Sequence, residues 1–146
     1  MDRTAHAKWQ GDLKSGKGLI STAGPALKDL AYSFSSRFEN GSGTNPEELI
    51  AAAHAGCFSM ALSAELAKVG VRTESIFTTA TVHLEKELNG FSIDSIHLVT
   101  RVPSDVPNQS AFLTAAERAK ENCPVSKLMR AKITLEVTQE SLGAEV

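Results

Sequence analysis

One long stretch, residues 45–70, constrains the fold more than any other part of the sequence. Asn45 can cap a helix, and Pro46 suits the first turn because its missing N–H needs no partner there. Glu48 stands three residues after the cap, where a capping-box carboxylate reaches back to it. Residues 49–62 are apolar or small at nearly every position, so the apolar surface goes around the helix. Such a helix is usually buried on all sides, and we expect it at the centre of the fold.

Length and composition indicate one soluble domain spanning residues 1–146. A formal charge of -2 argues against a nucleic-acid surface. Asp2, Arg3 and further polar residues interrupt the first apolar run, so we expect no signal peptide, and the 49–62 run is too short to span a bilayer. Two cysteines do not make a secreted disulfide framework. We therefore expect a cytoplasmic protein without a membrane segment.

The remaining sequence predicts strands, a second helix and a last strand. Alternation of apolar residues predicts a hairpin near the N-terminus and a third strand carrying Tyr32 and Phe34 on one face and Arg37 on the other. A second hairpin turns at Asn89-Gly90, and a phase slip near Asp94 indicates a β-bulge. The expected strands are 4–10, 17–22, 30–38, 75–88, 91–102 and 131–138, and the expected helical segments besides 45–70 are 109–121 and 125–130.

This order of elements predicts an α+β fold with antiparallel sheets around a long buried helix. A single sheet in a chain of 146 residues cannot easily enclose a helix that is apolar all round. Burial of the helix against its copy in a homodimer is the simplest solution.

The two cysteines are the first candidates for chemistry. Cys57 lies near the middle of the long helix, where a small buried cysteine can equally be an ordinary core residue. Cys123 lies at a helix break before Pro124, at the cap position of the short helix that follows, where backbone N–H groups can stabilise a thiolate. The two are 66 residues apart (123 − 57), so only the fold can bring them together.

Other polar residues have both a functional and a structural interpretation. His54, three residues before Cys57, could act as its base, although a buried histidine bonded to a carbonyl or a neighbouring strand is the commoner case. Glu47 and Arg37 can each be ordinary surface charges. The histidines on the expected strands show no ligand spacing, so we expect no metal. The residue pattern alone therefore indicates no more than that thiol chemistry is possible.

Two long motifs then identify a family resemblance. The segments TNPEELIAAAHAGCFSMAL (44–62) and ENCPVSKL (121–128) closely resemble the OsmC/Ohr family of thiol peroxidases, and in particular its osmotically inducible branch. Three shorter segments extend the resemblance over almost the whole chain: WQGDLKSGKG (9–18), SRFE (36–39) and AKITLE (131–136).

The resemblance implies an intertwined homodimer with two active sites at the interface. It implies reduction of organic hydroperoxides, and more slowly hydrogen peroxide, in oxidative or osmotic stress defence, with no cofactor other than an external dithiol reductant, possibly of the lipoyl type. By position, Cys57 corresponds to the peroxidatic cysteine and Cys123 to the resolving cysteine. Arg37 and Glu47 match the charged pair that the family places beside the reactive thiol.

The chemistry explains these residue types. Thiolate attacks peroxide, and an unperturbed cysteine with a pKa near ~8.5 is mostly protonated at neutral pH. A cation such as Arg37 favours the thiolate, and Glu47 would orient the guanidinium. Ten residues of helix separate Glu47 from Cys57, or roughly 15 Å along the axis. We therefore expect Arg37 and Glu47 of one chain to serve Cys57 of the other, unless the helix is broken.

Two other functions remain open. In the first, Cys57 and His54 form a hydrolase or acyl-transfer pair, which would need no Cys123. In the second, the protein is a non-enzymatic dimer that senses redox state or binds an apolar ligand, and Cys57 does not turn over peroxide.

Overall fold

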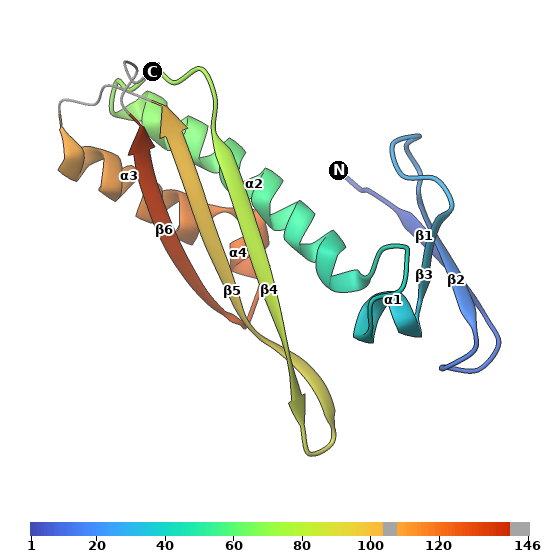
Figure 1. Ribbon diagram of the computed structural model, residues 1–146. Coiled ribbons are helices and arrows are strands. Elements are labelled where there is room, and N and C mark those ends of the chain that lie inside the picture. Colours follow the sequence, from blue (N-terminus) through green and yellow to red (C-terminus); the bar gives the residue numbers. More distant parts are fainter. Residues whose placement is uncertain (104–107, 141–146) are drawn as a thin grey trace, which may run out of the picture. The chain divides into compact units, whose positions relative to one another are not determined.

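The computed structural model describes residues 1–103 and 108–140. Contacts between residues divide the chain into an N-terminal unit, Met1–Leu49, and a C-terminal unit, Ile50–Val146. The expectation of one domain over 1–146 stays a prediction, and each unit is described by itself. The elements, labelled in Figure 1, are β1 (Ala5–Gln10), β2 (Lys17–Thr22), β3 (Leu30–Ser33), α1 (Phe34–Phe38), α2 (Pro46–Lys68), β4 (Phe77–Glu87), β5 (Gly90–Pro103), α3 (Gln109–Asn122), α4 (Pro124–Leu128) and β6 (Lys132–Glu140).

The N-terminal unit is built on a three-stranded antiparallel sheet in the order β1-β2-β3. The expected hairpin is confirmed, but the third strand ends at Ser33 instead of continuing to Phe38. Ser33 caps α1, because its hydroxyl accepts from the Ser36 N–H (3.1 Å) while the Ser36 hydroxyl accepts from the Ser33 N–H (2.8 Å). This capping box starts a helix where the apolar alternation predicted a strand, and it moves Arg37 onto α1.

The C-terminal unit holds the second three-stranded sheet, in the order β4-β5-β6. The β4–β5 hairpin is antiparallel, and its register shift leaves Asp94 as the extra residue, which confirms the predicted bulge. The β5–β6 pair is parallel, whereas antiparallel sheets were expected. The reason is the crossover through α3 and α4, which returns the chain to the same end of the sheet. The α+β class with a long helix is confirmed.

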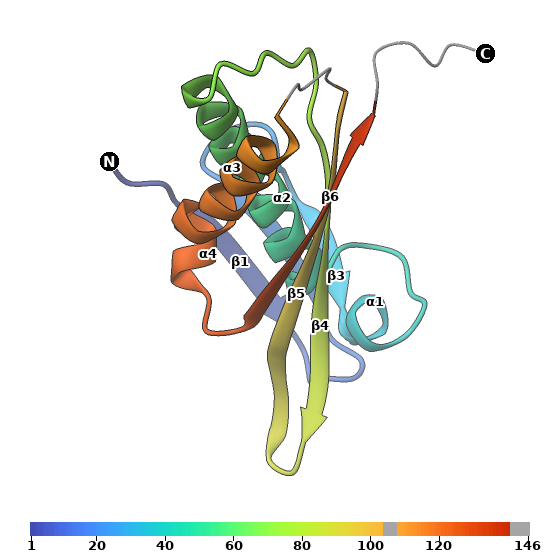
Figure 2. The same cartoon turned by 90° about the vertical axis from the view of Figure 1, so that its left-hand side faces the viewer.

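The helices α2, α3 and α4 cover one face of this second sheet (Figure 2). Their buried residues form one apolar core with the strands: Phe58, Leu62 and Leu66 of α2, Ile96, Leu98 and Val102 of β5, and Phe112, Ala115, Ala116 and Ala119 of α3, together with Cys123. The core therefore encloses one side of α2. The chain places both cysteines in or against this core.

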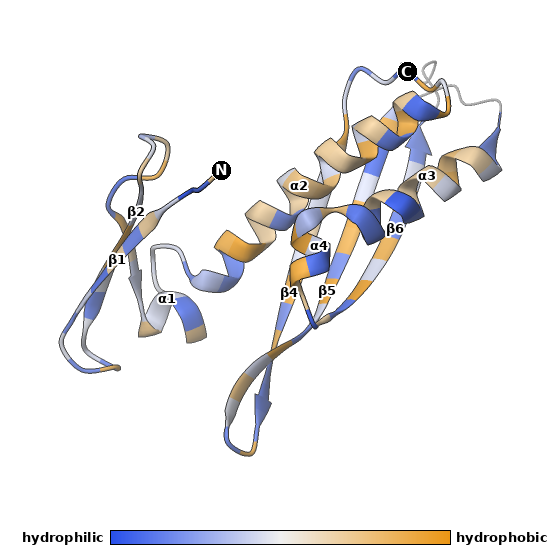
Figure 3. Ribbon diagram, turned by 180° about the vertical axis from the view of Figure 1, so that it is seen from behind, coloured by the Kyte–Doolittle hydropathy of each residue, from blue (hydrophilic) through white to orange (hydrophobic). Residues whose placement is uncertain are grey.

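The opposite side of α2 is exposed in the single chain, and its burial against a second copy stays a prediction. Met60 is 77% exposed, and Ala53 and Gly56, one turn apart on the same side, are also exposed. The α2 ribbon is nevertheless apolar over most of its middle (Figure 3). Part of the apolar surface of α2 is therefore left uncovered by the described residues of the C-terminal unit.

With 23 residues, α2 is long and apolar enough to cross a membrane by length and composition alone, and it is the one such helix in the described ranges. The expectation that it is too short considered only residues 49–62. The core helix of a soluble protein passes the same test, and Phe58, Leu62 and Leu66 belong to such a core. The absence of a membrane segment stays a prediction.

Candidate active site

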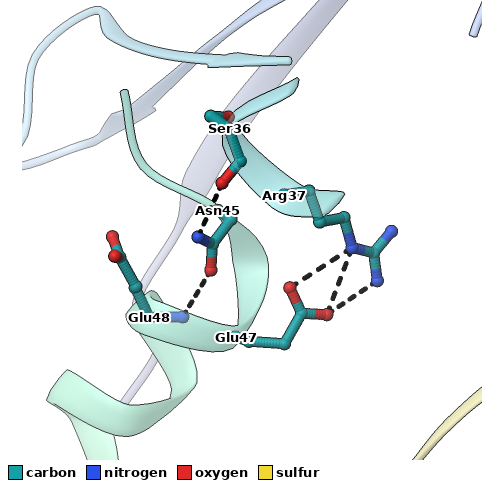
Figure 4. A network of polar contacts seen from close by, with 5 residues as sticks. All are labelled: Ser36, Arg37, Asn45, Glu47 and Glu48. Carbon is teal, nitrogen blue, oxygen red and sulfur yellow. Dashed lines mark hydrogen bonds and ion pairs between the residues drawn. The ribbon is translucent and has the colours of Figure 1, made fainter. Parts of the chain in front are cut away.

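The start of α2 carries one half of the expected site, within the N-terminal unit. Asn45 caps the helix by accepting a hydrogen bond from the Glu48 N–H (2.8 Å), as predicted. The Glu48 carboxylate accepts from the Thr44 hydroxyl (3.3 Å), so it does not have the predicted role of reaching back to the cap. The Asn45 side-chain amide donates to the Ser36 carbonyl (3.0 Å), which ties α1 to the first turn of α2 (Figure 4).

This connection brings Arg37 and Glu47 together. Arg37 donates from Nε to both carboxylate oxygens of Glu47 (3.2 Å each) and from Nη2 to Oε1 at 2.7 Å (Figure 4). The Arg37 guanidinium also lies 5.1 Å from the centre of the Phe38 ring. The Arg37 side chain is 38% exposed and that of Glu47 is 12% exposed. The ion pair fixes the guanidinium while leaving part of it available to another group.

A hollow of about 300 Å³ adjoins Arg37 in the N-terminal unit. Its walls are mostly apolar and aromatic, and the residues that line it are Trp9, Leu13, Tyr32, Ser33, Phe34, Arg37, Phe38 and Pro46. Such walls can hold an apolar molecule whose polar end reaches a single cation.

The C-terminal unit carries the other half, and it brings the two cysteines together. Cys123 ends α3 and caps α4, and it is completely buried. Its side chain lies within hydrogen-bonding reach of the Cys57 thiol on α2, and both are free cysteines. The separation of 66 residues in sequence is thus closed by the packing of α4 against α2.

The surroundings of Cys57 act mostly against its thiolate. Burial and the hydrogen bond with Cys123 raise the pKa of Cys57, and a hydrogen bond from the Val125 N–H lowers that pKa only in part. We expected backbone N–H groups of α4 to stabilise a thiolate at Cys123, whereas the Val125 N–H bonds Cys57. Neither Cys123 nor Val125 carries a positive charge, so these neighbours alone do not activate the thiol.

His54 is fully buried, and its Nε2 lies 2.8 Å from the Ser126 hydroxyl on α4. Burial lowers the pKa of His54, so the imidazole is neutral at pH 7. Its Nδ1 has no hydrogen-bond partner among the described residues. We expected a carbonyl or a strand as the partner, and no pattern in the sequence selects Ser126 or the Val125 N–H. The one available signal was Pro124 at the first helical position, since the N–H groups after it have no partner within the helix.

His83, Glu85 and Asp94 are the one group of possible metal ligands within residues 1–103 and 108–140. Their ligand atoms lie within 4.8 Å of one another, and all three residues are exposed. They lie at the bulge of the β4–β5 hairpin, and none was predicted as part of the site. The expectation of a metal-free and cofactor-free site stays a prediction.

Comparison with known proteins adds independent evidence. A family model described as OsmC-like protein matches residues 39–138. The chain is 46% identical over 139 residues to Peroxiredoxin OsmC of Escherichia coli K12, with 95% of this chain and 97% of that protein covered.

Two solved structures have a similar fold. An organic hydroperoxide resistance protein OsmC from Legionella pneumophila is 27% identical, with a TM-score of 0.69 and with 94% and 96% of the two chains covered. The organic hydroperoxide resistance protein OhrB of Bacillus subtilis is 25% identical, with a TM-score of 0.68 and with 94% and 98% covered. The fold and the sequence motifs therefore point to the same family.

Proposed function

The chain belongs to the OsmC family and is a peroxidase, and from that premise we propose that it reduces organic hydroperoxides by a two-cysteine cycle. Hydrogen peroxide is a poorer substrate in this proposal. The observation that carries it is the contact between Cys57 and Cys123, two thiols far apart in sequence and adjacent in the fold.

The proposed cycle balances in three steps. The Cys57 thiolate attacks the outer oxygen of the hydroperoxide, the O–O bond breaks, and Cys57 becomes a sulfenic acid. The alkoxide takes up the proton that the Cys57 thiol released on ionising and leaves as the alcohol. Cys123 then attacks the Cys57 sulfur, forming the disulfide and releasing water. An external dithiol, possibly of the lipoyl type, reduces the disulfide and is itself oxidised to a disulfide.

Arg37 supplies the missing positive charge in this proposal. Because α2 runs without a break from Pro46 to Lys68, Glu47 and Cys57 are separated by ten residues of continuous helix, about 15 Å along its axis. Arg37, held by Glu47, therefore acts on Cys57 of a second copy of the chain. There it favours the thiolate and polarises the peroxide.

The uncovered side of α2 supports a homodimer with the active sites at the interface. Ala53 and Gly56 are small residues that let a second α2 approach closely, and exposed Met60 adds an apolar side chain to the same surface. The aromatic hollow beside Arg37 would then hold the organic part of the hydroperoxide.

The cellular setting completes the proposal. The cycle needs a compartment that keeps thiols reduced, so we assign the protein to the cytoplasm, with no membrane or nucleic-acid partner. Its role there is defence against oxidative and osmotic stress. No metal, haem or flavin takes part in the proposed cycle.

Thiol loss and protein mass after one equivalent of cumene hydroperoxide test this function. We expect wild type to lose both thiols rapidly and to form the Cys57–Cys123 disulfide. Cys123→Ser should stop at a sulfenic or over-oxidised Cys57, and Cys57→Ser should be inert. Unreactive thiols in the wild type would overturn the peroxidase cycle and leave the apolar-ligand binder as the function.

The two other functions predict different results in the same experiment. A redox sensor would form the disulfide once without turnover when dithiol is supplied. A Cys57–His54 hydrolase would form an acyl-enzyme and keep full activity in Cys123→Ser. No observation favours the hydrolase, because the described hydrogen bond of His54 joins its Nε2 to Ser126 and not to Cys57.

A further inference from the structure

His54 has a polar contact that the peroxidase cycle does not use. It is fully buried on α2, one turn before Cys57, and its Nε2 lies 2.8 Å from the hydroxyl of Ser126. Ser126 is itself 7% exposed, so the bond is shielded from water. A buried polar pair of this kind is costly to break, because each partner would be left without a hydrogen bond.

The contact links the two elements that carry the cysteines. On α2, His54 and Cys57 are neighbours on one face, three residues apart. On the other side, Cys123, Val125 and Ser126 belong to the cap and first turn of α4. The Cys57 thiol meets the Cys123 side chain and the Val125 N–H, and the His54 ring meets Ser126. Three polar contacts therefore join α2 to one turn of α4.

That turn has little stability of its own. The α4 helix has five residues, its cap residue Cys123 makes no side-chain capping bond, and Pro124 has no N–H to donate. Isolated helices of this length are unstable in water. The position of α4 therefore depends on its contacts with other elements. The hydrogen bond between Ser126 and His54 is one of these contacts, and it is directional.

We propose that His54 is a positioning residue which, through Ser126, holds the first turn of α4 against α2 so that Cys123 and the Val125 N–H stay on Cys57. This inference rests on the proposed function and assigns its resolving step. After peroxide attack, Cys123 must come within about 2.05 Å of the Cys57 sulfur to form the disulfide. Loss of the His54–Ser126 bond lets α4 move, so the sulfenic acid lasts longer and is over-oxidised by excess peroxide.

The unpartnered Nδ1 selects one tautomer of His54. If Nε2 accepted the proton of Ser126, the proton of the neutral ring would lie on Nδ1 as a buried donor without a partner. Buried N–H groups without partners are rarer than unpaired acceptors. The Nε2–H form, donating to the Ser126 hydroxyl, is therefore the resident state, and it gives a distinct ¹⁵N chemical-shift pattern.

Two variants break the bond and one retains it. Ser126→Ala removes the hydroxyl, and His54→Leu replaces the ring by an apolar side chain. His54→Gln keeps an amide N–H that can donate to Ser126. Ser59→Ala is the matched control, because Ser59 lies on the same helix and its hydroxyl makes a bond of equal length, 2.8 Å, to Thr78 of β4 instead of α4.

The first readout is independent of peroxide. We measure alkylation of Cys57 by iodoacetamide against pH, with the modified peptide resolved by mass. Ser126→Ala and His54→Leu should remove both the Cys123 contact and the Val125 N–H from Cys57. Because burial and Cys123 raise the pKa of Cys57 more than the Val125 N–H lowers it, Cys57 should then react about threefold faster at neutral pH. His54→Gln and Ser59→Ala should follow the wild-type profile.

The second readout is the fraction of Cys57 that becomes sulfinic acid under a tenfold excess of cumene hydroperoxide. We expect about a fivefold rise in Ser126→Ala and His54→Leu, with the wild-type fraction in His54→Gln and Ser59→Ala. If Ser126→Ala and His54→Leu only lower the melting temperature, as Ser59→Ala does, His54 is a packing residue and the inference is wrong. A wild type inert to peroxide would instead refute the proposed function, and the alkylation profile would still decide the role of His54.

Discussion

At the scale of single residues, the proposed cycle depends on the charge state of Cys57. Burial and the neighbouring Cys123 raise its pKa, and one backbone N–H from Val125 opposes them. A thiol in these surroundings packs well but reacts slowly, because the thiolate is the nucleophile. In the proposed cycle, the arrangement that places Cys123 against Cys57 therefore also disfavours the Cys57 thiolate. A cation must reverse that effect, and Arg37 is the candidate with a fixed orientation.

His54 gives the first prediction at this scale, which concerns stability in acid. Burial holds the pKa of His54 below its ordinary value of 6.5, so the unfolded chain binds a proton at a higher pH than the native chain does. The stabilisation is complete above about pH 6.5 and is lost as the pH falls toward the native pKa, by at most about 1.4 kcal/mol per pH unit. Urea unfolding at pH 7.5 and pH 5.0, at one protein concentration, measures this loss.

In His54→Gln, the decrease in the free energy of unfolding between these pH values should be smaller than in wild type. The exposed histidine His6, replaced by glutamine, controls for loss of a histidine as such. An equal decrease in wild type and His54→Gln would mean that the imidazole does not titrate with folding.

At the scale of elements, the N-terminus of α2 depends on Asn45. Its Oδ1 accepts from the Glu48 N–H, and its Nδ2 donates to the Ser36 carbonyl. Asn45→Ala should lower the free energy of unfolding by about 2 kcal/mol, about half from the cap and half from the amide bond. Asn45→Asp keeps the acceptor and should recover about half of that loss in urea unfolding. If Asp is no better than Ala, the cap contributes nothing.

The elements also show where sequence reasoning succeeds. Asn45 and Pro46 predicted the start of α2 correctly, because capping is a local effect of adjacent residues. The third strand was predicted to reach Phe38, since the alternation of aromatic residues outweighed the serine pair Ser33 and Ser36, which form a capping box. The two serines are a local signal for that helix, and in the fold this capping box overrides the strand periodicity.

The contacts of the site are a different case. Ser126 lies 72 residues beyond His54, and no local pattern selects it as a partner. The Val125 N–H is a backbone group that almost any residue would supply, so the residue type at position 125 does not predict this hydrogen bond. The parallel β5–β6 pair likewise follows from the crossover through α3 and α4. Sequence motifs could name the two cysteines, but the groups that tune them depend on tertiary packing.

At the scale of the whole molecule, the proposal depends on which chain supplies Arg37. Mixing two inactive variants, Arg37→Ala and Cys57→Ser, answers this directly. In a mixed dimer, the Arg37→Ala subunit contributes Cys57 and the Cys57→Ser subunit contributes Arg37. If Arg37 acts across the interface, each mixed dimer therefore has one complete site. Random mixing makes about half of all dimers mixed, so about one quarter of wild-type activity should return.

The measurement is peroxidase turnover with cumene hydroperoxide and a dithiol after the two variants are unfolded together and refolded. Mixing Arg37→Ala with the double variant Arg37→Ala/Cys57→Ser is the control, because that pair contains no Arg37 and should recover nothing. Native mass spectrometry verifies that mixed dimers form. Mixed dimers without activity would mean that Arg37 serves the cysteine of its own chain, and an active Arg37→Ala variant would mean that another group supplies the charge that Cys57 lacks.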